Sequence, residues 1–239
     1  MKKLLAFFAF IPLLFAQAQT INITSEILNE GKEIAEIKKT AAPVGSSGIV
    51  IHKFDDKHST IVAHATIIEK KADRDIVKFS VFKALAQEAL PVPNLKPEKG
   101  DKVILKYLYD RGLIISPNKQ TYDAIKKRYK DIEWIHPDLF AAELSKSGTA
   151  APTKEDFQKF CEEYSLGIVY FAVEDIGYTV DCVSFKPVYK EKNAILSKEN
   201  FKLPFYSRVE EIQTSWFSFY KTTEIKDYTN YYKNLLETK

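Results

Sequence analysis

Glycine is scarce in this chain, which has eight glycines in 239 residues, against a usual share of roughly 7%. No two glycines are two positions apart, so the G-x-G-x-x-G fingerprint of dinucleotide-binding folds is excluded. No glycine is followed by Lys-Ser or Lys-Thr, which excludes a P-loop. The sequence therefore gives no support to nucleotide chemistry.

Arginine is rarer still, because four of the 35 basic residues are arginine and the other 31 are lysine. Arginine is the better bidentate ligand for phosphate, so a protein built around phosphate recognition is not expected. A bias in genome base composition explains the lysine surplus more simply. The formal net charge of +3 is also too small for a sequence-independent nucleic-acid binder. We expect no nucleic-acid partner.

Long hydrophobic runs are absent after the N-terminus. There, two lysines precede the apolar residues 4–15, and Ala16-Gln17-Ala18 is a small-x-small cleavage pattern. The run is shorter than the about 20 residues that cross a bilayer. We interpret residues 1–18 as a cleaved signal peptide rather than an amphipathic or anchored helix. Its removal takes away two lysines and leaves an exported mature chain of net charge +1.

Residues 19–111 carry the patterns of short β-strands. The β-branched runs 48–54 and 60–68 flank a five-residue polar loop, which predicts a hairpin. Residues 75–82 alternate polar and apolar side chains, as a half-buried strand does, and 103–109 predict a further strand. Strands at this spacing predict an antiparallel β-subdomain that is barrel-like or sandwich-like.

After residue 112 the sequence alternates between strand and helix patterns, which predicts an α/β layer. Ser116 resembles a helix N-cap with Pro117 at the first helical position. Thr153 and Asp156 resemble a capping box at the start of a later helix. The uninterrupted apolar run 168–173 predicts a strand that is buried on both faces. Strands are also expected at 113–115, 132–135 and 178–185, and a short helix from Pro137 to near Gly148.

The last fifty residues are rich in aromatic side chains, with eleven between Pro187 and Lys239. Apolar residues at helical spacing predict an amphipathic helix over about 223–238. The densest aromatic group is Trp216, Phe217, Phe219 and Tyr220. Exposed, this group would form a partner patch; buried, which is the commoner fate, it would close the core. The fold class is therefore α+β, with a β-rich subdomain over 19–111 and an α/β subdomain over 112–239.

The chain has two cysteines, and export permits them to form a disulfide. Cys161 lies on the apolar face of a predicted helix and Cys182 on a nearby predicted strand, so the two can meet. We favour a structural disulfide over two buried free thiols, because there is no C-x-x-C motif of a redox site. A closed loop of about 21 residues would stabilise the fold by about 3 kcal/mol.

Metal and catalytic motifs are missing. His52, His58 and His64 lie within thirteen residues, but without the ligand spacing of a zinc or copper site, so surface and edge-strand histidines are favoured. There is no G-x-S-x-G elbow and no supported S-x-x-K motif. We favour packing at a helix start as the role of His136. An enzyme that uses His136 as a catalytic base together with dispersed carboxylates is a third functional class, after a binding protein and a structural protein. We expect no enzyme, no metal and no cofactor.

Three stretches resemble a known family: Lys-Gly-Asp-Lys-Val at 99–103, Arg-Gly-Leu-Ile-Ile-Ser-Pro-Asn at 111–118, and Ile-His-Pro-Asp-Leu-Phe-Ala-Ala at 135–142. They look like the N-terminal domain of the plasminogen-binding protein family of Helicobacter, Campylobacter and related bacteria. The resemblance extends over about residues 30–230. It implies an exported protein, in the periplasm or on the outer surface of a Gram-negative bacterium, that captures host plasminogen through lysine.

The resemblance directs attention to Lys239, the last residue of the sequence. A C-terminal lysine presents an ammonium and a carboxylate at a short separation, the zwitterion that kringle modules bind. Plasminogen-binding family members carry a long lysine-rich region after this domain, whereas this sequence stops where the domain stops. Capture is therefore expected to depend on Lys239 and scattered surface lysines. The alternative is a periplasmic structural or scaffold protein of an envelope assembly such as the flagellar motor.

Overall fold

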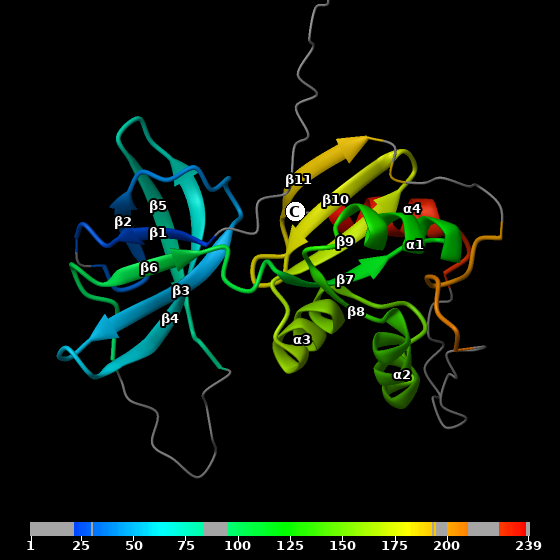
Figure 1. The fold of residues 1–239 in the computed structure, drawn as a ribbon, viewed down its shortest axis with the longest axis horizontal. Helices are drawn as coiled ribbons and strands as arrows, with labels where there is room; N and C mark the ends of the chain where they lie inside the picture. The colour runs from blue at the N-terminus through cyan, green and yellow to red at the C-terminus, as the bar shows by residue number, and fades with distance from the viewer. Residues whose placement is uncertain are drawn as a thin grey trace, which may run out of the picture.

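Two β-sheets lie side by side in the computed structural model (Figure 1), and helices pack on the second of them. The predicted α+β class is confirmed. The structure describes residues 22–29, 31–83, 95–192, 194, 200–209 and 225–237. Residues 1–18, the aromatic group Trp216 to Tyr220, and Lys239 lie outside the described residues.

The first sheet is antiparallel throughout, with the strand order β1-β6-β3-β4-β5-β2. It curls so far that its two edge strands approach each other, and an isolated bridge joins Ile27 to Ile37. Its strands are β1 (Ile23–Glu26), β2 (Ile34–Lys38), β3 (Ser47–Lys53), β4 (Ser59–Lys70), β5 (Arg74–Ser80) and β6 (Lys102–Leu105). The curled sheet agrees with the predicted barrel-like arrangement.

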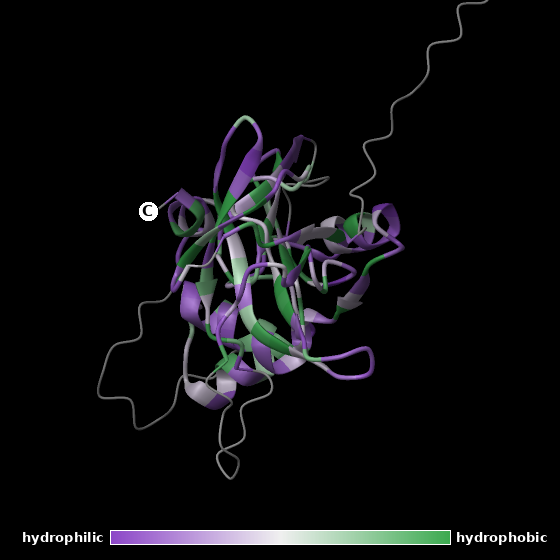
Figure 2. Ribbon diagram, turned by 90° about the vertical axis from the view of Figure 1, so that its left-hand side faces the viewer, coloured by the Kyte–Doolittle hydropathy of each residue, from purple (hydrophilic) through white to green (hydrophobic). Residues whose placement is uncertain are grey.

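Side-chain alternation explains how this sheet forms its core. The predicted hairpin over 48–68 is β3 and β4, which pair in antiparallel register. Along β4 the side chains of Ala63, Ala65 and Ile67 point inward and are buried, while their neighbours are more exposed. The strands in the centre of the molecule are mainly hydrophobic and the peripheral loops mainly hydrophilic (Figure 2).

The second sheet is mixed, with the order β11-β10-β9-β7-β8. Strand β7 runs parallel to both of its neighbours, whereas β9, β10 and β11 are antiparallel. The strands are β7 (Arg111–Ile115), β8 (Glu133–Ile135), β9 (Ile168–Val173), β10 (Ile176–Asp181) and β11 (Pro187–Lys192). The first sheet thus ends at Leu105, and the second begins six residues later at Arg111.

Helices pack on both faces of the second sheet: α1 (Lys119–Arg128), α2 (Pro137–Ser147), α3 (Lys154–Tyr164) and α4 (Tyr228–Glu237). Alternate residues of β9 point to opposite faces of the sheet and pack into two different hydrophobic cores. Val169 and Phe171 pack with α2, α3 and α4, whereas Ile168 and Tyr170 pack with α1. Every side chain of β9 is buried, which confirms a strand covered on both faces. None of the helices described has the length or the apolar character needed to cross a membrane.

The predicted start of the first helix is wrong by two residues. The N-cap of α1 is Asn118, whose side-chain oxygen accepts the N–H of Thr121 at 2.9 Å. Ser116, the predicted cap, instead donates its hydroxyl to the carbonyl of Asn118 at 3.2 Å. Asn118 is itself extended, with φ −152° and ψ 166°, so the helix begins only after Asn118 and Ser116 is not its cap. The predicted capping box of Thr153 and Asp156 is present in α3.

Two predicted strands end four residues early in the structure, the strand predicted at 75–82 ends two residues early at Ser80, and β11 was not predicted. The strand expected at 103–109 ends at Leu105, because Lys106 and Leu108 adopt positive φ values of 58° and 62° in the turns that follow. The strand expected at 178–185 ends at Asp181, where a turn begins. Strand β11 was missed because Val188 is its one buried side chain.

Helix α4, the predicted C-terminal amphipathic helix, docks on the sheet through two buried tyrosines, Tyr228 and Tyr232. The hydroxyl of Tyr228 donates to the carbonyls of Ile115 in β7 at 3.2 Å and Ala172 in β9 at 2.9 Å. Burial raises the pKa of Tyr228 well above 10, so it remains a donor at neutral pH. One side chain therefore links α4 to two central strands.

Replacing Tyr228 with phenylalanine should lower the free energy of unfolding by about 1–2 kcal/mol, because two buried carbonyls lose a donor. Urea unfolding of residues 19–239, followed by circular dichroism, measures the change. The matched control is Tyr231→Phe on the same helix, which removes a half-buried hydrogen bond to the carbonyl of Pro152. An equal loss in both variants would contradict a special role for the buried hydroxyl.

Candidate functional site

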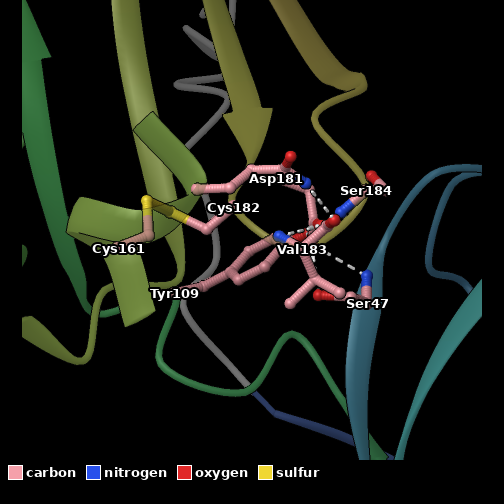
Figure 3. Close-up of a disulfide and its surroundings, with 8 residues drawn as sticks. Ser47, Tyr109, Cys161, Asp181, Cys182, Val183 and Ser184 are labelled. Atoms are coloured by element: carbon pink, nitrogen blue, oxygen red, sulfur yellow. Dashed lines mark hydrogen bonds between the residues drawn. A yellow bond between two sulfur atoms is a disulfide. The ribbon is translucent and has the colours of Figure 1, made fainter. Parts of the chain in front are cut away.

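The two sheets are joined by the carboxylate of Asp181, the last residue of β10 (Figure 3). Its Oδ2 accepts hydrogen bonds from the N–H of Ser47 at 2.8 Å, the hydroxyl of Ser47 at 2.6 Å and the hydroxyl of Tyr109 at 2.8 Å. Ser47 is the first residue of β3. A single oxygen of the second sheet therefore holds the first residue of the central strand of the first sheet.

The other oxygen of Asp181 organises the turn that follows β10. Its Oδ1 accepts the N–H groups of Val183 at 3.0 Å and Ser184 at 2.7 Å. The hydroxyl of Ser184 then donates to the carbonyl of Gly45 at 2.7 Å, which is a second link to the first sheet. The carboxylate is fully buried, and its five hydrogen bonds offset the cost of removing its charge from water.

Tyr109 contributes a donor that does not titrate near neutral pH. Burial, aided by the negative charge of Asp181, raises its pKa well above 10. Tyr109 lies in the connection between β6 and β7, so the chain that links the two sheets is fixed by the same carboxylate. We call Asp181, Ser47, Tyr109 and Ser184 the joint.

A disulfide stands directly beside the joint (Figure 3). Cys182 follows Asp181 and pairs with Cys161 of α3, with a Cα–Cα distance of 6.0 Å. This pairing agrees with the prediction from the sequence. The side-chain amide of Gln158, also on α3, donates to the carbonyl of Val183 at 2.6 Å. Helix α3 is thus tied covalently and by a hydrogen bond to the turn that Asp181 organises.

A cavity of about 800 Å³ lies between the two sheets and beside the disulfide. This volume falls within the range of small-molecule and cofactor sites, which occur preferentially at interfaces of this kind. Apolar side chains lining it include Ile61, Val81, Phe82, Leu108, Leu166 and Val183. Polar and charged ones include His64, Lys83, Arg111, Gln158 and Glu162.

The three clustered histidines do not converge. His52 Nδ1 lies 2.8 Å from the carboxylate of the buried Asp101, and His58 Nδ1 lies 2.7 Å from that of Asp55 in an exposed loop. His64 lines the cavity, where burial lowers its pKa and keeps the imidazole neutral at pH 7. The described part of the chain holds no group of three or more His, Cys, Asp or Glu side chains placed to bind a metal ion.

The usual ligand crevice of an α/β sheet is filled by the chain itself. Open α/β sheets bind ligands at the carboxyl ends of the strands where the strand order reverses, which here lies between β7 and β9. Tyr228 bridges these two strand ends. The N–H of Tyr206 donates to the carbonyl of Ser116 at 2.7 Å, and the N–H of Lys202 to that of Pro117 at 2.8 Å. Residues 202–206 and α4 therefore occupy this crevice.

His136 packs at a helix start, in the role that the sequence favoured. It is the N-cap of α2, and its side chain accepts the N–H of Asp138 at 3.2 Å. Its ring lies 5.3 Å from that of Tyr122 and 6.5 Å from that of Tyr206. Burial lowers the pKa of His136, against the opposing effect of the Asp138 charge. His136 therefore caps and packs within an aromatic group.

Two sets of predicted site residues are not placed by the structure. Lys239 follows the last residue of α4, Glu237, by two positions. The group Trp216, Phe217, Phe219 and Tyr220 falls between the described residues Val209 and Ile225. Both stay predictions. Conversely, the sequence did not reveal the joint or the cavity, whose residues come from distant parts of the chain.

Comparison with known proteins gives a match to one family and to two curated relatives. Residues 20–236 match the family model described as plasminogen-binding protein pgbA N-terminal. Two curated relatives, from Helicobacter pylori strains J99 and 26695, are both named plasminogen-binding protein PgbA. Each is 26% identical over 220 residues, which cover 92% of this chain and 48% of the relative. The chain thus spans about half the length of the curated relatives it matches.

Replacing Asp181 with asparagine should lower the free energy of unfolding by about 2–4 kcal/mol, because an amide NH₂ cannot accept all the buried donors that face the carboxylate. Urea unfolding measures the loss, and hydrogen exchange at the Ser47 and Ser184 amides should accelerate. The control Asp110→Asn changes an exposed carboxylate next to Tyr109. The importance of the joint would be disproved by equal stability in the two variants.

Replacing both cysteines with serine should lower the free energy of unfolding by about 3 kcal/mol, because the disulfide closes a loop with a sequence separation of 21. Urea unfolding with and without reductant measures this effect. Wild-type protein in reductant should approach the stability of the double variant, which should not respond to reductant. The disulfide would be contradicted if reductant, added while the wild-type protein is unfolded in urea, left its free energy of unfolding unchanged.

Proposed function

Because the chain belongs to the plasminogen-binding protein pgbA N-terminal family, we propose that it is an exported protein that binds plasminogen without acting as an enzyme. The match over residues 20–236 carries this proposal, since it includes both sheets and nearly all of α4. The names of both relatives describe binding. A switch-point crevice filled by Tyr206 and Tyr228 also supports a binding role rather than catalysis.

Export is supported by the position of the family match and by the disulfide. The family match begins at residue 20, directly after the predicted cleavage site at Ala18. The Cys161–Cys182 disulfide suits an oxidising compartment outside the cytoplasm. The mature chain resides in the periplasm or on the outer surface in this proposal, and protease treatment of intact cells distinguishes the two locations, because only a surface protein is cut.

More specifically, we propose that lysine side chains make the contact with plasminogen and that Lys239 is the principal one. A kringle that binds lysine pairs separately with its ammonium and a nearby carboxylate, and packs the methylene stem on aromatic rings. Lys239 follows the exposed end of α4 at Glu237 by two residues. The many surface lysines of the chain would contribute weaker contacts, since an internal lysine has no terminal carboxylate beside it.

A second candidate function is that of a structural protein in an envelope assembly. The cavity between the two sheets favours it, because a binding site at this interface can serve a bacterial partner and does not require plasminogen. Recovery of a bacterial partner by pull-down from intact envelopes supports this candidate, whereas recovery of the monomer alone opposes it.

Replacing Lys239 with alanine in residues 19–239 should weaken binding to immobilised human plasminogen at least about tenfold, or about 1.4 kcal/mol, because the zwitterion loses its ammonium. Surface plasmon resonance measures the affinity. The matched control is Lys226→Ala, which removes an exposed lysine shortly before α4 and should change the affinity less than about twofold. A free lysine analogue should compete with the wild-type protein.

The outcomes distinguish binding through lysines in general from binding through Lys239 in particular. Competition by the lysine analogue without any effect of Lys239→Ala would assign the contact to other lysines and reject the role of Lys239. Absence of plasminogen binding, or binding that ignores both the analogue and the substitution, would reject the lysine-dependent function of this chain.

A further inference from the structure

The cavity between the sheets has features that plasminogen binding through lysine does not use. Its wall on the side of the first sheet is formed by the starts of β3 and β4 and by the residues after β5. Its opposite wall is formed by α3 and the turn that follows β10. The joint and the disulfide hold these walls together at one side, so the cavity is a fixed groove between two rigid sheets.

One strand along this groove has an unpaired edge. Strand β4 spans Ser59–Lys70, but its pairing with β5 begins only at His64, opposite Ser80. Among the described residues, Ser59 to Ala63 pair with β3 alone. Such an edge presents backbone N–H and C=O groups that can bond to an added strand. Ile61 lies within this stretch and lines the groove.

Of the described residues after β5, Val81 to Lys83 form no ladder with this edge, and apolar side chains lie beside it. Val81, Phe82 and Lys83 are outside any strand and line the groove. Val81 is 71% exposed, and the ring of Phe82 packs 4.8 Å from that of His64. Val81 and Phe82, together with Ile61 and Leu108, offer apolar contacts next to backbone groups that pair with no second strand in the described structure. Side chains that alternate along an added strand require this combination.

The charges of the groove favour an acidic ligand. The groove is lined by two basic side chains, Lys83 and Arg111, and by one acidic side chain, Glu162. The imidazole of His64 is neutral at pH 7. The Nε of Arg111 is buried and has no hydrogen-bond partner in the described structure. The acid that Arg111 approaches, Glu133, is 3.4 Å away and 66% exposed. Exposed ion pairs contribute little, so the guanidinium is available to a ligand carboxylate.

We propose that this groove binds an extended, apolar segment of a partner protein, which adds as a strand to Ser59–Ala63 and places a carboxylate at Arg111. The free edge of β4 favours a peptide over a small molecule, because a small molecule does not supply a row of backbone donors and acceptors. The net positive charge supplies complementarity to an acidic side chain or C-terminus. The site is independent of Lys239 and of plasminogen.

A phage-displayed library of short random peptides, selected on immobilised residues 19–239, provides the probe. The enriched peptides should alternate apolar residues and carry Asp, Glu or a free C-terminal carboxylate. Fluorescence anisotropy with one synthetic enriched peptide then measures affinity. Replacing its carboxylate by an amide should weaken binding at least about tenfold. Hydrogen exchange of the amides between Ser59 and Ala63 should slow when the peptide binds, because an added strand protects them.

Two substitutions in the protein test the groove directly. Val81→Glu changes an exposed side chain at the mouth of the groove, so it should leave folding intact. It removes an apolar contact and adds a negative charge that repels the acidic peptide, so it should weaken peptide binding at least about tenfold. Arg111→Gln should do the same by removing the guanidinium. The matched control is Arg74→Gln in the first sheet, which also removes an arginine paired with a glutamate, Glu36. It should change the affinity less than about twofold.

The proposal fails if no peptide is enriched, or if the enriched peptide binds Val81→Glu as tightly as the wild-type protein. It also fails if the peptide binds without protecting any amide between Ser59 and Ala63. A change of oligomeric state in Val81→Glu, measured by size-exclusion chromatography, would assign the groove to a second copy of this chain instead. If Arg111→Gln does not fold, the result with Val81→Glu decides, and plasminogen binding by Val81→Glu should remain at the wild-type level.

Discussion

The buried carboxylate of Asp181 is the constraint on which the arrangement of the molecule depends. An ionised carboxylate removed from water costs several kcal/mol unless donors surround it. Here the donors come from Ser47 in the first sheet, Tyr109 in the connection, and the turn after β10. No single sheet supplies them all. The carboxylate is therefore satisfied only when both sheets are docked, which makes the orientation of the sheets a condition for stability.

The disulfide extends this constraint to a helix and shapes the groove. Asp181 and Cys182 are consecutive, so the turn that holds the first sheet also holds α3 through Cys161. Both walls of the groove are thereby fixed to the same short segment. The opposite end of the second sheet is closed by Tyr228 and residues 202–206. The molecule thus leaves open the groove between its sheets, while it fills the position where α/β enzymes place their substrates.

Features set by neighbouring residues could be predicted from the sequence, whereas those set by distant residues could not. The β3–β4 hairpin, the Thr153 capping box and the fully buried β9 depend on local patterns. The first helix was misplaced because Ser116 and Asn118 are both residue types that cap helices well, and it is the Asn118 side chain that accepts the N–H of Thr121. The joint had no local signal, since 134 residues separate Ser47 from Asp181. The free edge of β4 was hidden because it depends on where β5 ends.

Display of a lysine and formation of the groove make different demands on the fold. A lysine bound by a kringle needs a flexible stem and accessible charges, and neither two docked sheets nor a buried carboxylate is required for that. An added strand needs an edge held in place, apolar contacts and a guanidinium for its carboxylate; the joint and the disulfide hold the two walls that carry these groups. The family match covers residues 20–236 and thus both sheets with the groove between them. The proposed peptide recognition therefore requires the docked sheets, which presentation of a lysine does not.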